Sequence, residues 1–72
     1  MEDFAFDYSA MEELINEKIV GKKAERNRKI LKLRFLVGLT FAEIAEEMGM
    51  SDIQISRIVH RYGDPLLLML RK

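Results

Sequence analysis

The pattern of apolar and polar positions is clearest between residues 40 and 62. Gly49 divides this stretch, and glycine is typical of a helix end where the chain turns sharply. The apolar positions on either side of it recur at helical spacing: Phe41, Ile44, Ala45 and Met48 before it, and Ile55, Ile58, Val59 and Tyr62 after it. Two pairs have the spacing of a capping box, Thr40 with Glu43 and Ser51 with Gln54. The pattern predicts two helices joined by a tight turn, which is a helix-turn-helix.

Helical spacing also appears earlier in the chain. Ser9 and Glu12 form a third capping pair and predict a first helix that reaches Val20 and stops at Gly21. Its apolar stripe consists of Met11, Leu14, Ile15 and Ile19. A second helix is expected from about residue 23 to residue 37. Its charged first half should face water or a partner, and its apolar second half should be the centre of the core.

The chain after Tyr62 carries a separate helix signal. Gly63 is followed by Asp64 and Pro65, an N-cap residue and a proline at the first helical position. We therefore expect the second helix of the helix-turn-helix to end at Gly63 and a short apolar helix to follow it. The whole pattern predicts an all-α fold, a small bundle of about five helices that contains a helix-turn-helix. Its expected segments are an acidic N-terminal arm with the first helix (1–20), a helix-turn-helix core (21–63) and a short apolar C-terminal helix (64–72).

Length and composition exclude several functional classes. A chain of 72 residues is expected to form one domain. It has no cysteine and one histidine, so we expect no disulfide, no metal site and no cofactor. Neither a glycine-rich phosphate loop nor a nucleophile constellation occurs, so an enzyme is not expected. No apolar run reaches the length of a membrane span, and the acidic N-terminus does not fit a secretory signal. A cytoplasmic domain without a membrane segment is the expectation.

The charge of the chain is unevenly distributed although its formal sum is zero. Residues 1–20 hold six acidic side chains and one basic side chain, which gives 1 − 6 = −5. The rest of the chain holds eleven basic and six acidic side chains, which gives 11 − 6 = +5. Such asymmetry is typical of nucleic-acid-binding proteins, but it also fits two solvated faces that attract each other. The first helix is accordingly either part of the core or an arm that covers the basic surface until a partner displaces it.

The second helix of the helix-turn-helix has an outward-facing set of side chains if its apolar positions face inward. These are Asp52, Ile53, Ser56, Arg57, His60 and Arg61. In a helix-turn-helix this helix enters the major groove. Arg57 is the expected base reader, because a bidentate contact with guanine is the commonest specific interaction. The alternative for Arg57 is a surface salt bridge to a glutamate.

The remaining positions of this surface have less specific roles. Ser56 can serve a base or a phosphate, and His60, Arg61 and the helix starts at Thr40 and Ser51 suit phosphates. The acidic and apolar members of the set fit DNA less well. Asp52 can accept from cytosine or simply favour the helix N-terminus, and Ile53 can touch a thymine methyl or pack on a protein.

Residues 30–58, ILKLRFLVGLTFAEIAEEMGMSDIQISRI, resemble the C-terminal DNA-binding domain of bacterial sigma factors, called region 4. The resemblance extends over roughly residues 24–62. The matching positions are Leu33, Arg34, Gly38, Glu43, Ile44, Ala45, Glu46, Glu47, Gly49, Ser51, Ile55, Ser56, Arg57 and Ile58. The resemblance implies that the second helix of the helix-turn-helix reads a promoter −35 element and that the domain contacts the β-flap of RNA polymerase.

Two functional hypotheses follow. The first is a sequence-specific DNA-binding module of transcription initiation, whose partners are promoter DNA and RNA polymerase. The second is a protein-interaction module that uses the same scaffold to bind RNA polymerase or another regulator. The apolar run near the C-terminus, residues 66–70, also has two possible roles, since five consecutive apolar residues cannot all face inward. It either covers the core or contacts polymerase, a regulator or a second copy through Leu66, Leu67 and Leu70.

Overall fold

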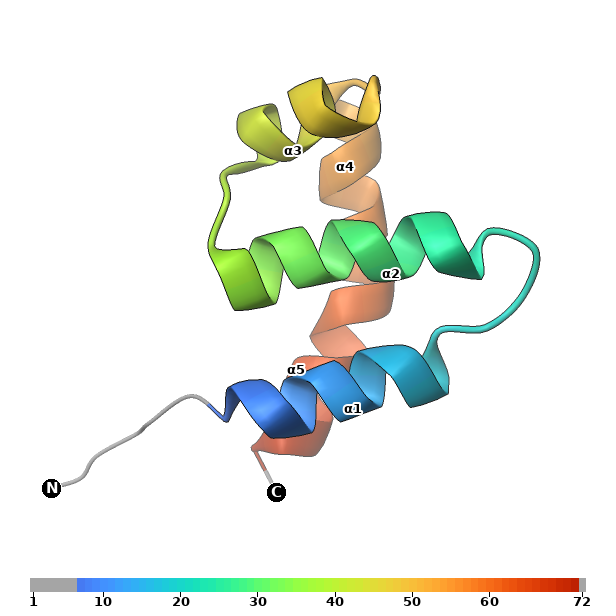
Figure 1. The fold of residues 1–72 in the computed structure, drawn as a ribbon, viewed down its shortest axis with the longest axis vertical. Helices are drawn as coiled ribbons and strands as arrows, with labels where there is room; N and C mark the ends of the chain where they lie inside the picture. The colour runs from blue at the N-terminus through green and yellow to red at the C-terminus, as the bar shows by residue number, and fades with distance from the viewer. Residues whose placement is uncertain (1–6, 72) are drawn as a thin grey trace, which may run out of the picture.

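The computed structural model describes residues 7–71, and over this range all regular structure is helical (Figure 1). The helices are α1 (Tyr8–Lys18), α2 (Ala24–Lys32), α3 (Phe41–Met48), α4 (Asp52–Ile58) and α5 (Asp64–Leu70). Two of these helices continue directly into a π-helical segment: α2 into Leu33–Val37 and α4 into Val59–Gly63. The prediction of an all-α fold is confirmed. The helix count differs slightly, because α4, its π-helical segment and α5 form one continuous rod.

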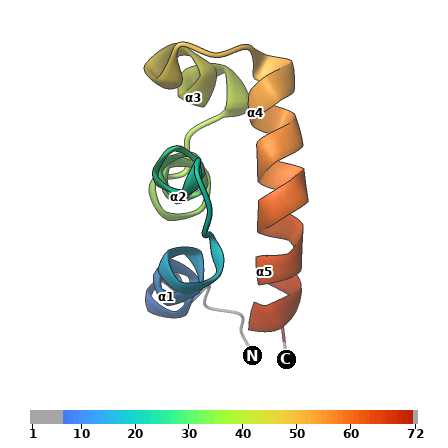
Figure 2. The ribbon, with the colours of Figure 1, turned by 90° about the vertical axis from the view of Figure 1, so that its right-hand side faces the viewer.

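The long rod of α4 and α5 organises the molecule. Figure 2 shows α1, α2 and α3 stacked along one side of this rod. In Figure 1, α2 crosses the rod near its middle, and α1 lies beside α5 at the other end from α3. The start of α4 is therefore packed by α3, while its opposite side carries no other helix.

One hydrophobic core runs between the stack and the rod. The fully buried large side chains come from every helix: Met11, Ile15, Ile30, Leu31, Ile44, Ile55 and Leu66. Helix α1 contributes two of them, so it is part of the core and not an arm lying on the surface. Burying such side chains is worth about 1.5–3 kcal/mol each, which makes α1 a substantial part of the stability of so small a domain.

The start of α1 differs from the prediction. Asp7, not Ser9, is the N-cap, and its carboxylate accepts the N–H of Ala10 at 3.0 Å. Ser9 therefore lies inside the first turn of the helix. The helix ends at Lys18 and does not reach Val20. The capping pair was misplaced because aspartate two positions earlier is an equally good N-cap and starts the helix sooner.

The charged first half of α2 is also less exposed than expected. Ala24 and Asn27 are buried, with 9% and 4% of their surface exposed. Asn27 Oδ1 accepts from Arg26 Nε at 3.1 Å and from Arg26 Nη2 at 3.0 Å. One side of this half therefore packs against the protein, because α2 contacts both α1 and the rod, and only the other side faces water.

The predicted break at Gly63 is wrong. Gly63 has φ −83° and ψ −39°, and Asp64 also has right-handed helical angles. The chain passes through the π-helical turn Val59–Gly63 directly into α5. A π-helical turn shifts the hydrogen-bond register, and the rod continues through Pro65, which has no N–H to donate. Gly63 is instead buried beside Phe35, where a Cβ would lie 2.8 Å from the nearest ring carbon.

The C-terminal apolar run is divided between the core and the surface. Leu66 is 2% exposed, and Leu67 and Leu70 are partly buried against the core. Leu68 and Met69 are the exposed members, at 66% and 44%. Leu66 therefore has the first of the two predicted roles, covering the core, and does not offer a contact to a partner, because helical geometry turns it inward beside α1. Leu67 and Leu70 keep part of their surface exposed beside Leu68 and Met69.

Candidate DNA-binding surface

Both predicted capping boxes are present and define the starts of α3 and α4. Thr40 Oγ1 accepts the N–H of Glu43 at 3.1 Å, and Glu43 Oε1 accepts the N–H of Thr40 at 2.9 Å. Ser51 and Gln54 form the same pair at 3.2 and 3.1 Å. Gly49 ends α3 with φ 68° and ψ 36°, a left-handed conformation that glycine adopts without a Cβ clash. The helix-turn-helix is confirmed.

The inner sides of the two helices pack as their apolar spacing predicts. Ile44 and Ala45 of α3 are buried, and so are Ile55 and Ile58 of α4. Phe41, Met48 and Tyr62 are partly buried around them. The orientation of α4 about its own axis is thereby fixed, which determines the side that faces solvent.

All eight residues predicted to contact DNA reach the surface. Asp52, Ile53, Arg57, His60 and Arg61 are exposed on the rod, and Ser56 is half-buried at the edge of the same face. The other two, Thr40 and Ser51, are exposed at the starts of α3 and α4. Figure 2 shows that this end of the rod is covered on one side only. The predicted set therefore lies on α3 and the first half of the rod and extends to the turn Val59–Gly63 at its middle.

Arg57 has the accessibility that a base-reading residue needs. Its side chain is exposed, and no carboxylate within residues 7–71 forms an ion pair with it. The alternative of a surface salt bridge to a glutamate is therefore not found in this part of the chain. Arg57 lies about one and a half turns into the helix, close to the first turn that approaches base edges in a helix-turn-helix.

His60 is held by two neighbours that sequence reasoning did not assign to the site. Its Nδ1 lies 3.4 Å from Asp64 Oδ2, and its ring meets Phe41 edge-on with centroids 6.1 Å apart. The Asp64 contact has the i,i+4 spacing of helical neighbours and was readable from the sequence. Both partners are largely exposed, so this pair adds little stability.

Arg34, which lies just after α2, contacts the same Phe41 ring as His60 does. Its guanidinium carbon lies 4.6 Å from the centre of the Phe41 ring, and its Nη1 donates to the carbonyl of Leu39 at 3.0 Å. It therefore holds the connection that leads into α3 through Leu39 and Phe41. This role could not be predicted from the sequence, because it depends on how the chain folds back after Gly38.

The described residues contain no cluster of histidine, cysteine, aspartate and glutamate suited to a metal ion. Among the same residues, no helix is both long and apolar enough to cross a membrane.

The fold and the exposed face of α4 together define a helix-turn-helix domain of the DNA-binding type. A family model for sigma-70, region 4, matches residues 24–62, more than half of the chain. The chain belongs to this family. The match covers α2, α3 and α4, whereas α1 and α5 lie outside it. No curated protein and no solved structure was found to match the chain.

Proposed function

We propose that this protein is a sequence-specific DNA-binding module of transcription initiation that reads a promoter −35 element with α4 and contacts RNA polymerase. The observation that carries the proposal is the exposed row on α4, fixed by buried side chains within a helix-turn-helix that matches the region 4 family. The domain has no need of a cofactor for this activity, because recognition rests on hydrogen bonds and charge.

The base-reading part of the proposal centres on Arg57. An arginine that donates two hydrogen bonds to guanine discriminates against other bases by about 1–3 kcal/mol. Ser56 lies beside it and is half-buried, so it suits a base edge or a nearby phosphate. Asp52 and Ile53 approach the same groove one turn earlier. There Asp52 can accept from a cytosine amino group, and Ile53 can contact a thymine methyl.

The remaining members position the domain on the sugar–phosphate backbone. Arg61 and His60 are exposed one turn beyond Arg57. Thr40 and Ser51 mark the helix starts, where N–H groups not used by the capping boxes favour a phosphate. Such contacts orient the recognition helix without carrying sequence information. The two roles are therefore separable by mutation.

The proposal is tested by Arg57→Ala. The probe is a duplex enriched by the protein from a randomised pool, and the measurement is fluorescence anisotropy. Losing the guanine contact should raise Kd for this duplex about 10- to 100-fold and reduce the preference over a scrambled duplex. Arg71→Ala removes the same charge at the far end of the rod and should change Kd by less than about twofold. Unchanged binding by the Arg57 variant would show that another residue reads the bases.

A protein-interaction role is favoured by one observation. The start of α4 presents an exposed carboxylate and an exposed isoleucine, Asp52 and Ile53, the latter 65% exposed. Neither attracts phosphates. Salt separates the two roles, because log Kd for DNA rises linearly with log salt and an apolar protein interface responds little. Co-precipitation with RNA polymerase, with and without the enriched duplex, shows whether polymerase binding needs DNA.

A further inference from the structure

The uncovered side of the rod carries a row of exposed side chains along its whole length. Figure 2 shows that α1, α2 and α3 all lie on the other side, where the buried side chains of the rod pack. Successive members of the row are three or four positions apart, the spacing that keeps side chains on one side of a helix. The row consists of Ile53, Arg57, His60, Asp64, Leu68 and Arg71. A partner can therefore lie along the full length of the rod.

The order of residue types along the rod suits a second copy of the same rod. Both halves run acidic, apolar, basic: Asp52, Ile53 and Arg57, then Asp64, Leu68 and Arg71. In an antiparallel pair with its two-fold axis near residues 60 and 61, the halves face each other in opposite order. Ile53 and Leu68 are then both about 11 Å from the axis, and Arg57 and Asp64 are both about 5 Å from it. Apolar side chains meet each other, and each of these charges meets the opposite charge.

Charge selects this direction of pairing over the parallel one. In a parallel pair, Arg57 would face Arg57 of the second copy, and Asp64 would face Asp64. Like charges held opposite each other repel, whereas the antiparallel pair places Arg57 against Asp64 twice. The large exposed apolar side chains also fit the antiparallel direction, because Ile53 and Leu68 are 65% and 66% exposed and lie at opposite ends of the row.

The centre of the rod carries His60 and Arg61, which are the residues least suited to pairing with themselves. Each is turned toward a neighbour on its own rod. The guanidinium carbon of Arg61 lies 5.7 Å from the centre of the Tyr62 ring, and His60 Nδ1 lies 3.4 Å from Asp64 Oδ2. Asp64 therefore supplies negative charge on both sides of the two-fold axis, between His60 of its own copy and Arg57 of the second copy.

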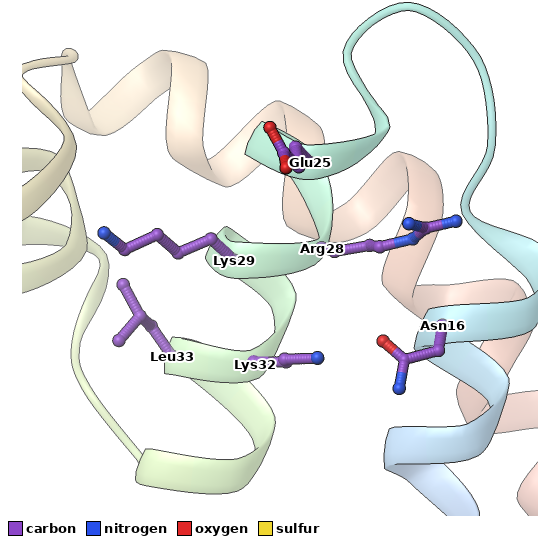
Figure 3. A pocket seen from close by; sticks show the side chains of 6 residues that line it. All are labelled: Asn16, Glu25, Arg28, Lys29, Lys32 and Leu33. Atoms are coloured by element: carbon purple, nitrogen blue, oxygen red, sulfur yellow. The ribbon is translucent and has the colours of Figure 1, made fainter.

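The other charged surface, between α1 and α2, does not select a partner by charge. Arg28 and Lys32 point from α2 toward α1 (Figure 3). Asn16 lines this groove and also the neighbouring hollow on α1 that Glu13 and Glu17 line. Cations and carboxylates therefore occur close together there. On the rod the two signs are instead separated along its length, which a second antiparallel copy can match.

We propose that two copies of this protein pair antiparallel through the uncovered sides of their rods. Ile53 packs against Leu68 of the second copy, and Arg57 pairs with its Asp64. The two-fold axis repeats both contacts, and Asp52 and Arg71 pair at the ends of the interface. Two rods in contact over about 27 Å form a small interface, so the dimer should be weak, with a Kd of about 100 µM.

This pairing uses side chains that we propose to contact DNA. Arg57 and His60 belong to both surfaces, so a paired copy cannot also place α4 in a major groove. DNA and the second copy therefore compete for the rod. The pairing itself does not depend on the proposed DNA binding, whereas the competition rests on it.

Sedimentation equilibrium of the full chain tests the pairing, at concentrations from about 10 µM to about 1 mM. The average mass should rise from that of one copy toward that of two. Arg57→Asp places like charges opposite each other and should raise Kd for pairing at least about tenfold. The double variant Arg57→Asp with Asp64→Arg should restore it to within about threefold. Lys29→Asp makes the same change of charge on exposed α2 and should leave Kd within about twofold.

An uncharged substitution tests the apolar contact. Leu68→Gln removes the contact with Ile53 at both ends of the dimer and should raise Kd for pairing about tenfold. Its Kd for the enriched duplex should stay within about twofold, because Leu68 lies on α5, beyond the proposed DNA contacts. Unchanged pairing by this variant would contradict the proposed register.

Other outcomes would overturn the proposal. A chain that remains a single copy up to about 1 mM does not pair, and equal weakening by Arg57→Asp and Lys29→Asp would mean that net charge alone governs association. Failure of the double variant to restore pairing would remove the contact between Arg57 and Asp64. Adding the enriched duplex should release single copies bound to DNA, and an intact dimer on the duplex would refute the competition. A chain that pairs but binds no duplex would refute only the proposed DNA binding.

Discussion

Two glycines of the helix-turn-helix region show how one residue type serves different needs. Gly49 has φ 68° and lets α3 end in a tight turn. Gly63 has ordinary helical angles, and what it supplies is the absence of a side chain where the rod crosses Phe35. The first role is readable from its place after a helical pattern. The second depends on a residue from another helix.

At the scale of single residues, we predict that Gly63→Ala destabilises the protein. Alanine in a helix is normally more stable than glycine by about 1 kcal/mol. Here its Cβ would meet ring carbons of Phe35 at 2.8 and 2.9 Å, and such overpacking costs about 1–3 kcal/mol. A net loss of about 1 kcal/mol in the free energy of unfolding is expected, measured by urea denaturation.

The control for this substitution is the double variant Gly63→Ala with Phe35→Leu, compared with Phe35→Leu alone. Once the ring is removed, alanine should be neutral or stabilising, as in an ordinary helix. If alanine stabilises the protein even with Phe35 present, the close contact does not constrain position 63.

At the scale of elements, the continuous rod carries the proposed DNA contacts and also packs against α1. Its first half carries the proposed DNA contacts, and its second half, α5, packs against α1. The orientation of the recognition helix is therefore fixed from both ends of the molecule. Because α5 is α-helical, its consecutive leucines point to different surroundings.

The C-terminal apolar run gives a direct test of which side chains of α5 face the core. Leu66→Ala should reduce the free energy of unfolding by about 2–5 kcal/mol, because it leaves a cavity in the core. Domains of this size have about 3–5 kcal/mol in total, so much of the population should unfold. Leu68→Ala, two residues away but 66% exposed, should change stability by less than about 0.5 kcal/mol. Thermal melts followed by circular dichroism compare the two, and similar losses would contradict the assigned register.

At the scale of the whole molecule, the family segment does not close its own core. Residues 24–62 contain the helix-turn-helix, but Met11, Ile15 and Leu66, which lie outside that segment, complete the buried cluster. Helix α1 contacts α2, its π-helical extension and α5. We infer that the described parts of the three predicted segments, residues 7–71 in all, fold as one cooperative unit.

Removal of residues 1–20 distinguishes this inference from the model of a displaceable acidic arm. If α1 completes the core, the shortened chain should lose its cooperative thermal transition and its DNA binding together. If α1 were only an arm, the shortened chain would stay folded and bind DNA more tightly, since an acidic competitor would be gone. Replacing Glu12 and Glu13 with glutamine provides the control, because both are exposed and only charge is removed.

The sequence by itself determined the local features of this protein. The capping boxes at Thr40 and Ser51, the turn at Gly49 and the outward row around Arg57 each depend on residues within about one or two helical turns. Family membership was readable for the same reason, because its motif is a local pattern. The all-α class followed from the summed apolar spacing.

Only the tertiary structure decided what depends on contacts between distant residues. The rod continues through Gly63, although glycine followed by Asp-Pro is locally a break signal, and the glycine is needed there because Phe35 of another helical segment occupies the space of a side chain. Tertiary packing also decides which side chains of the C-terminal apolar run are buried. It likewise brings Arg34 into contact with Phe41. Local propensities amount to about 1 kcal/mol per residue, and burial of one large side chain outweighs them.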